Sequence, residues 1–127
     1  MTSIRVLIVD DMAQVRRDLC TVLPLAGQAA GLQIEIVGEA SDGQEAIQRA
    51  TALEPDVVLM DLEMPVMGGY EATRQIKTHC PDCRVIALTI HGDETVQQKA
   101  SQAGVDEFVV KGAPINSLIQ AMAKEKE

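Results

Sequence analysis

The chain has 127 residues but contains no tryptophan, one tyrosine and one phenylalanine. This scarcity of aromatic rings disfavours a flavodoxin-like cofactor binder, because such a protein normally packs rings against the isoalloxazine of its flavin. Long apolar runs are also missing, since the longest stretches fall well short of the ~18 residues that indicate a membrane span. The N-terminus lacks a charged region followed by an apolar segment, so no secretory signal is expected. The sequence therefore predicts a cytoplasmic protein with no membrane partner.

Cysteine is scarce as well, and the three cysteines do not make a disulfide framework. Cys80 and Cys83 form a CxxC motif beside His79, but a structural zinc site needs four ligands. The remaining candidates, Cys20 and His91, are distant in sequence. A thioredoxin-like CxxC would open a helix after a strand, whereas this one follows a helical pattern and precedes a strand. We therefore expect a loop with two incidental thiols.

Basic residues are outnumbered, with 11 basic against 19 acidic residues and a net charge of −8. This charge repels a phosphate backbone, so direct binding of nucleic acid is not expected. Apolar residues at 46% and charged residues at 24% are ordinary for a globular protein. The length fits one domain that occupies residues 1–127.

Short apolar stretches rich in valine and isoleucine alternate five times with helical patterns. Strands are expected at about 4–9, 34–40, 57–60, 84–88 and 106–110, and helices at about 12–26, 43–53, 70–78, 93–104 and from 114 onward. Pro24 is expected to kink or end the first helix. The alternation predicts an α/β fold with a parallel sheet between two layers of helices.

Polar residues stand at the ends of these apolar stretches. They are Asp10, Asp11, Asp61, Thr89 and Lys111. In open parallel sheets the ligand site lies beyond the carboxyl ends of the strands, so these side chains should converge on one pocket. Each acid taken alone could be a helix cap or a loop charge, and the functional interpretation depends on all five falling at the same edge.

The chemistry of this set indicates a divalent metal and a phosphoryl group. Carboxylates brought close together repel one another unless a cation lies between them, and Mg²⁺ prefers oxygen ligands. An aspartate carboxylate can act as a nucleophile and form an aspartyl phosphate. Lys111 and Thr89 could each hold a phosphoryl oxygen.

At these residues the chain resembles the receiver (CheY-like) domain of two-component response regulators, over essentially its whole length. The matching segments are VLIVDD, DVVLMDLEMPVMGGYEA, VIALT and AGVDEFVVKG, and the DxxMPxMxG pattern begins at Asp61. The resemblance implies a doubly wound, flavodoxin-like sheet of five strands in the order 2-1-3-4-5, in a three-layer sandwich.

The resemblance also implies a role for each site residue. Asp61 would accept a phosphoryl group from a sensor histidine kinase or a phosphotransfer protein. Mg²⁺ (or Mn²⁺) would be bound by Asp10, Asp11, Asp61 and the backbone carbonyl of Glu63. Thr89 and Lys111 would hold the phosphoryl oxygens, and Thr89 and Phe108 would act as the switch.

Phosphorylation would then alter the surface made by the fourth helix, the fifth strand and the fifth helix, and an output domain or partner would read it. The resemblance implies a self-phosphorylating acceptor with slow dephosphorylation rather than a turnover enzyme. A phosphorylation-dependent homodimer is one expected consequence. Glu63 and His91 occupy variable positions on the pocket rim, and we hypothesise that they face each other and affect attack by water.

The segment after Lys111 departs from the family pattern. Many receivers have proline directly after the lysine, whereas Gly112 and Ala113 precede Pro114 here. Glycine at this position is typical of receivers that precede a LuxR-type helix-turn-helix, so a C-terminal DNA-binding output domain absent from this chain is expected. The alternatives are a phosphatase of the dehalogenase type, whose nucleophile would follow the first strand, and an interaction module that never accepts phosphate.

Overall fold

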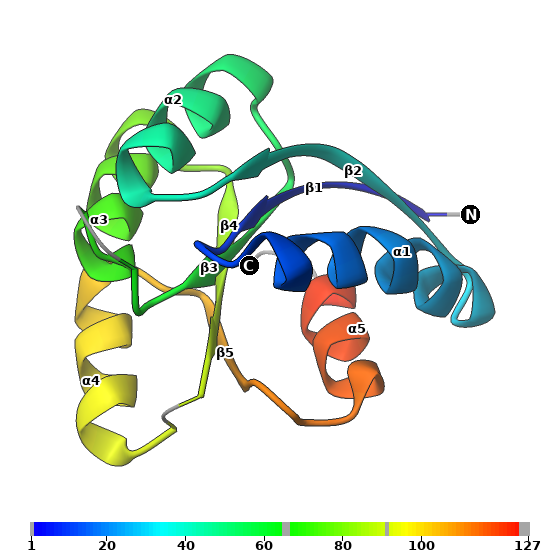
Figure 1. Ribbon diagram of the computed structural model, residues 1–127. Helices are drawn as coiled ribbons and strands as arrows, with labels where there is room; N and C mark the ends of the chain where they lie inside the picture. Colours follow the sequence, from blue (N-terminus) through cyan, green and yellow to red (C-terminus); the bar gives the residue numbers. More distant parts are fainter. Residues whose placement is uncertain (1, 65–66, 91, 125–127) are drawn as a thin grey trace.

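The computed structural model describes residues 2–64, 67–90 and 92–124. In this part, strands and helices alternate five times, as the sequence predicts (Figure 1). The elements are β1 (Thr2–Val9), α1 (Ala13–Ala29), β2 (Leu32–Ala40), α2 (Gly43–Leu53), β3 (Val57–Asp61), α3 (Gly69–His79), β4 (Arg84–Thr89), α4 (Glu94–Ala103), β5 (Glu107–Val110) and α5 (Ile115–Ala123).

The five strands form one parallel sheet in the order β2-β1-β3-β4-β5. This confirms the predicted order and places β1 beside β3, where the connections change direction. Every residue of β3 and β4 is buried, because helices cover both faces of the sheet. The continuous apolar pattern of these strands follows from that burial.

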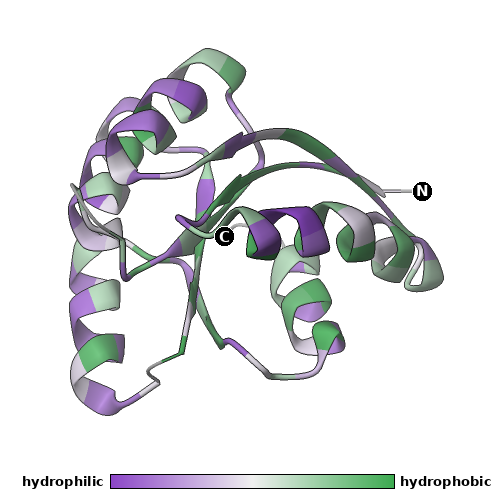
Figure 2. Cartoon of the chain, in the orientation of Figure 1, coloured by the Kyte–Doolittle hydropathy of each residue, from purple (hydrophilic) through white to green (hydrophobic). Residues whose placement is uncertain are grey.

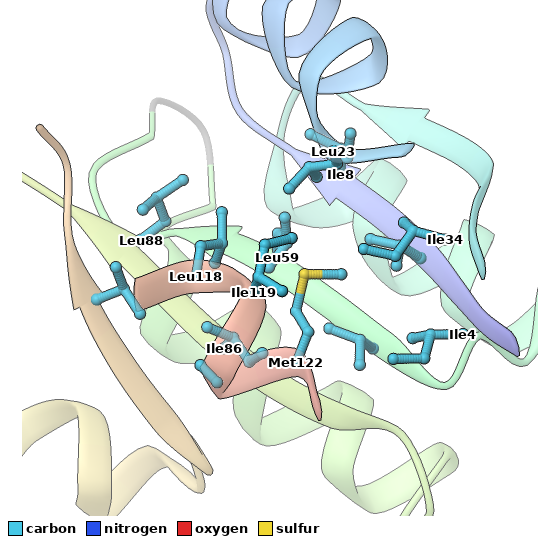
Figure 3. Packing of buried hydrophobic residues seen from close by; sticks show 14 residues of the cluster. Ile4, Ile8, Leu23, Ile34, Leu59, Ile86, Leu88, Leu118, Ile119 and Met122 are labelled. Carbon is cyan, nitrogen blue, oxygen red and sulfur yellow. The ribbon is translucent and has the colours of Figure 1, made fainter. Parts of the chain in front are cut away.

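Each face of the sheet has its own hydrophobic core. Successive strand residues point to opposite faces, so Val6 and Ile8 pack with Leu118 and Ile119 beneath α1 and α5 (Figure 3). The neighbouring residues of β1 pack on the other face with residues of α2, α3 and α4: Leu7, Val9, Ala46, Ala50, Ala72, Ile76 and Ala100. Figure 2 shows hydrophobic residues along the central strands and hydrophilic residues on the outer helices.

Several helix ends match their sequence signals. Asp42 and Asp93 each accept a hydrogen bond from a backbone N–H in the first turn of α2 and α4, at 2.8 and 2.9 Å. Gly104 ends α4 with a φ of 103°, a conformation that favours glycine. Pro24 does not end the first helix, because α1 continues to Ala29. The buried side chain of Leu23 and the close packing of Gly27 on Ile34 hold this helix to the sheet across the missing hydrogen bond.

None of the helices in the described part has the length and apolar character needed to cross a bilayer.

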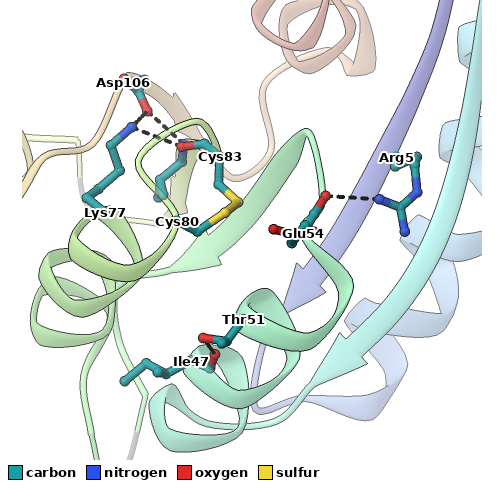
Figure 4. The surroundings of a disulfide bond; sticks show 9 residues. Arg5, Ile47, Thr51, Glu54, Lys77, Cys80, Cys83 and Asp106 are labelled. Atoms are coloured by element: carbon teal, nitrogen blue, oxygen red, sulfur yellow. Dashed lines mark hydrogen bonds and ion pairs between the residues drawn. A yellow bond between two sulfur atoms is a disulfide. The ribbon is translucent and has the colours of Figure 1, made fainter.

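The turn between α3 and β4 carries a covalent bond that the sequence analysis does not predict. The expected loop is confirmed, but Cys80 and Cys83 are joined in a disulfide, so the expectation of two incidental thiols is wrong (Figure 4). Pro81 and Asp82 fold the chain tightly, and the Cys83 N–H donates to the Cys80 carbonyl at 3.1 Å. This turn brings the two Cα atoms to 5.6 Å, within the range that a disulfide requires.

Candidate functional site

The predicted site residues meet at the carboxyl edge of the sheet. Asp10 directly follows β1, Asp61 and Thr89 are the last residues of β3 and β4, and Lys111 directly follows β5. Strand register aligns these ends, because Thr89 pairs with Val110 and the Lys111 N–H donates to the Thr89 carbonyl at 2.7 Å. The sheet thus brings together side chains that are up to 101 residues apart in the sequence.

Three carboxylates form the centre of the site. Asp10, Asp11 and Asp61 each offer an oxygen, and these oxygens lie within 4.8 Å of one another. Asp10 and Asp61 are buried, whereas Asp11 is exposed at the rim. Oxygen donors at this spacing fit a hard cation such as Mg²⁺, which would relieve their mutual repulsion and keep positions open on its solvent side.

The Lys111 ammonium lies between two of these acids. Its Nζ donates to Asp10 Oδ2 at 2.8 Å and lies 3.5 Å from Asp61 Oδ2. Burial acts to lower the pKa of Lys111, but the hydrogen bond to Asp10 and the charges of Asp61 and Asp10 outweigh it, so the pKa is raised. The lysine therefore stays cationic at neutral pH and provides a fixed positive charge beside Asp61.

The pKa of the Asp61 carboxyl is raised above its ordinary value. Burial is the largest cause, and the charges of Asp10 and Asp11 add to it. The Glu63 N–H, which donates to Asp61 Oδ1 at 3.0 Å, and the Lys111 charge oppose the shift without cancelling it. A poorly hydrated, basic carboxylate of this kind suits a nucleophile.

The hydroxyl of Thr89 faces the same pocket from β4. Thr89 is fully buried, and its Oγ1 donates to Glu63 Oε1 at 3.4 Å. The predicted switch partner Phe108 lies half-buried on β5, and a Cβ atom added to Gly92 would come within 3.7 Å of its ring. The prediction for His91 concerns a residue outside the described part of the chain.

A turn after Lys111 replaces the proline that many receivers have. The Ala113 N–H donates to the Val110 carbonyl at 3.1 Å, and Gly112 has a φ of 92°. Gly112 is the third residue of the four-residue turn Val110–Ala113. A positive φ at this position favours glycine, because a residue with a Cβ atom is strained there. Gly112 therefore makes the bend that directs the chain from Lys111 into α5.

Two contributors to the site were missed by the sequence analysis. Arg16 of α1 donates to the Asp10 carbonyl at 2.7 Å and pairs with Glu39 at 3.1 Å. These contacts hold the segment after β1 that carries Asp10 and Asp11. Gly69 begins α3 so close to β3 that an added Cβ atom would lie 2.4 Å from the Asp61 carbonyl oxygen. The Gly68-Gly69 pair was a visible signal for a close approach, whereas Arg16 looked like any polar helix residue.

A model of the response regulator receiver domain matches residues 6–123, which include all these side chains. The chain belongs to the receiver domain family. This receiver domain is 40% identical over 119 residues to the response regulator GacA of Pseudomonas viridiflava, and the match covers 94% of this chain and 53% of GacA. The chain thus spans about half the length of the curated relatives it matches.

Solved structures agree with this assignment. A LuxR-family two-component response regulator from Aurantimonas sp. SI85-9A1 has a TM-score of 0.81 and 33% identity, over 94% of this chain and 81% of that chain. The CheX-CheY-BeF3-Mg²⁺ complex from Borrelia burgdorferi gives a TM-score of 0.79 and 27% identity, over 93% of this chain and 85% of that chain. The CheY-like fold and the role of the receiver domain in two-component phosphorelay signalling are therefore confirmed, and the LuxR-family match fits transcription regulation.

Proposed function

We propose that Asp61 is the phosphoacceptor of this receiver domain. The observation that supports this choice is the position of its carboxylate, buried at the end of β3 with Asp10 and Asp11 within 4.8 Å and the Lys111 ammonium at 3.5 Å. Asp10 also contacts the lysine, but Asp61 is the acid that ends β3, the central strand of the sheet. A phosphatase of the dehalogenase type would instead place its nucleophile after the first strand, which argues for the receiver chemistry.

The transfer can be written from the residues of the pocket. An Asp61 carboxylate oxygen attacks the phosphorus of a phosphohistidine, the P–N bond breaks, and the imidazole leaves with the bonding electron pair. Lys111 and the Thr89 hydroxyl hold phosphoryl oxygens and offset their charge. Mg²⁺ (or Mn²⁺), when bound by Asp10, Asp11, Asp61 and the Glu63 carbonyl, supplies the positive charge that lets carboxylates and phosphoryl oxygens approach.

The product would redirect the hydroxyl of Thr89. In the unmodified domain this hydroxyl donates to Glu63, and a phosphoryl oxygen on Asp61 would compete for it. The family resemblance implies that Thr89 would then move toward Asp61 and that Phe108 would rotate inward, which would change the surface of α4, β5 and α5. A shift from ~1% to ~99% of the active form requires roughly 5.5 kcal/mol of preferential interaction with that form.

We infer the donor and the target from the family. A sensor histidine kinase or a phosphotransfer protein would supply the phosphoryl group. The curated relatives are about twice as long as this chain, and the similar solved structures include a LuxR-family regulator. We therefore propose that phosphorylation acts through a C-terminal DNA-binding output domain and a phosphorylation-dependent homodimer. We place the protein in the cytoplasm, where such kinases present their phosphohistidine, and we regard it as a stoichiometric acceptor that dephosphorylates slowly.

Phosphorylation by acetyl phosphate in the presence of Mg²⁺ tests the proposal. Intact mass should rise by one phosphoryl group in the wild type and in an Asp18→Asn control, whose exposed acid lies on α1. Asp61→Asn should not gain this mass, and beryllofluoride should perturb the wild type and the Asp18→Asn control but not Asp61→Asn. Equal labelling of Asp61→Asn would assign a different acceptor, and multiple turnover of a small phosphomonoester would favour the phosphatase. A wild type that takes no phosphoryl group would favour the phosphorylation-independent interaction module.

A further inference from the structure

The disulfide between Cys80 and Cys83 lies at the edge of the sheet opposite the acidic site. Cys80 follows the last residue of α3, and Cys83 directly precedes β4, which runs from there to Thr89 (Figure 4). The phosphoryl chemistry proposed above uses neither sulfur. Any role of this bond therefore lies in the turn itself.

The turn is held by hydrogen bonds that do not need the disulfide. The Cys80 N–H donates to the Ile76 carbonyl at 2.7 Å, and the Cys83 N–H donates to the Cys80 carbonyl at 3.1 Å. The Lys77 ammonium, which also pairs with Asp106, donates to the Cys83 carbonyl at 2.9 Å. A cross-link between residues three positions apart restricts the unfolded chain far less than a link that closes a long loop. The fold should consequently persist whether the sulfurs are joined or reduced.

The two sulfurs differ in their access to solvent. Cys83 is 1% exposed and belongs to the core beneath α2, α3 and α4, whereas Cys80 is only partly buried. A thiolate from solution attacks the sulfur that it can reach in line with the S–S bond, so Cys80 is the point of entry. Cys20 is a free, partly buried thiol that packs on the other face of the sheet, apart from this pair. Burial, and then the Glu39 charge, raise the pKa of that thiol and make it a poor nucleophile.

We propose that Cys80 and Cys83 form a reversible redox site, in which Cys80 exchanges with low-molecular-weight thiols and Cys83 is the buried resolving sulfur. A thiolate RS⁻ attacks Cys80 Sγ, the bond to Cys83 breaks, and Cys83 leaves as a thiolate that takes up a proton. A second RS⁻ attacks the R sulfur of the mixed disulfide and releases Cys80. The sum is protein disulfide plus two RSH giving protein dithiol plus RSSR, and the same steps in reverse restore the bond.

Glutathione in its reduced and oxidised forms is a suitable probe. The experiment uses folded protein that carries Cys20→Ser, so that only Cys80 and Cys83 can react. The reaction is quenched with acid, and the thiols are then alkylated and analysed by mass. The wild-type pair should reach the same ratio of disulfide to dithiol from either direction without denaturant. Cys83→Ser should form one glutathione adduct at Cys80, and Cys80→Ser should form an adduct at Cys83 at least about tenfold more slowly, because access controls the exchange.

Circular dichroism and thermal unfolding of each variant establish that the comparison is made on folded protein. If a variant does not fold, the transient glutathione adduct of the wild type is mapped instead, and it should reside on Cys80. Three outcomes would overturn the proposal: equal adduct rates in Cys83→Ser and Cys80→Ser, a transient adduct of the wild type that resides on Cys83, or reduction of the wild type only when denaturant is present. Because none of these readouts involves phosphorylation, failure here leaves the assignment of Asp61 untouched.

Discussion

Lys111 is the residue whose single charge holds the acidic pocket together. Its Nζ contacts Asp10 at 2.8 Å and Asp61 at 3.5 Å, and both of these carboxylates are buried. Lys111→Met leaves two buried acids without this counter-charge, so we expect a loss of about 1–3 kcal/mol in the free energy of unfolding at pH 7, measured with urea. The same variant should be strongly impaired in labelling by acetyl phosphate.

Lys111→Arg serves as the control, because it keeps the charge but not the length and shape of the ammonium. It should retain most of the stability and lose part of the labelling. Addition of Mg²⁺ should narrow the stability gap between Lys111→Met and the wild type, since a bound cation can replace the missing charge among the carboxylates. Equal stability of the Met variant and the wild type without Mg²⁺ would contradict this account of the lysine.

Glu63 is expected to tune the lifetime of the phosphoryl group through Thr89. Glu63→Ala removes the 3.4 Å hydrogen bond from Thr89, so this acceptor no longer competes with a phosphoryl oxygen for the hydroxyl. A hydrogen bond worth about 0.5–1.5 kcal/mol corresponds to about 2–10-fold in rate, so dephosphorylation should slow within that range. Glu63→Gln keeps an acceptor for the Thr89 hydroxyl but removes the negative charge, so it separates the effect of the charge from that of the hydrogen bond. Unchanged dephosphorylation in both Glu63→Ala and His91→Ala would remove the hypothesis of a tuning rim.

At the scale of the elements, the start of α3 depends on Gly69. An added Cβ atom would lie 2.4 Å from the Asp61 carbonyl oxygen and 2.7 Å from Leu62 Cα, distances that force the helix away from β3. Gly69→Ala should therefore cost about 1–3 kcal/mol in unfolding free energy and reduce labelling of Asp61.

Gly68 provides a matched control for this prediction one position earlier. A Cβ atom there would meet only the Leu62 carbonyl, at 3.9 Å, and its φ of −71° is open to any residue. Gly68→Ala should remain within about 0.5 kcal/mol of the wild type. Urea unfolding of the two variants side by side measures the difference. Similar losses in both would show that the glycine pair acts through flexibility and not through close contact.

The elements also show which features a sequence pattern can predict. Strand positions followed from continuous apolar runs, because burial on both faces leaves a one-dimensional signal in β3 and β4. The passage of α1 through Pro24 did not, because it depends on how Leu23 and Gly27 pack against the sheet. The same holds for Arg84, whose buried guanidinium donates to the last carbonyls of α5, at Ala121 and Met122. Contacts between distant elements leave no periodicity to detect.

At the scale of the whole molecule, the parallel sheet explains why the site could be predicted. All five strands point the same way, so residues at their carboxyl ends share one edge whatever their separation in sequence. The rule places Asp10, Asp61, Thr89 and Lys111 together without any knowledge of distances. It does not give the burial of each acid or the pairing of the lysine, since these depend on how closely the neighbouring loops approach.

Burial of the Asp61 carboxylate should lower the free energy of unfolding of the whole domain. The pKa of Asp61 is raised in the folded state, chiefly by burial, above its ordinary value of 3.8. At pH values between 3.8, the ordinary pKa, and the raised pKa of the folded state, the folded state binds more protons than the unfolded state. The contribution of Asp61 to the free energy of unfolding therefore falls as pH rises through this window. Above the raised pKa the full cost of the buried charge is present.

Replacement of this carboxyl by a neutral amide should consequently stabilise the domain. Asp61→Asn is expected to gain about 0.5–2 kcal/mol at pH 7 in the absence of Mg²⁺, as substitutions that relieve an active site commonly do. The gain should shrink as pH falls from the raised pKa toward 3.8, because the wild-type carboxyl becomes protonated in the folded state, and below 3.8 it is protonated in both states. Urea unfolding of both proteins from pH 4 to 8 measures it, with Asp18→Asn as the exposed control that should stay near zero throughout. A loss at pH 7 would mean that the contact between Asp61 and Lys111 outweighs the burial of the acid. A gain independent of pH would mean that the charge of the carboxylate is not the cause.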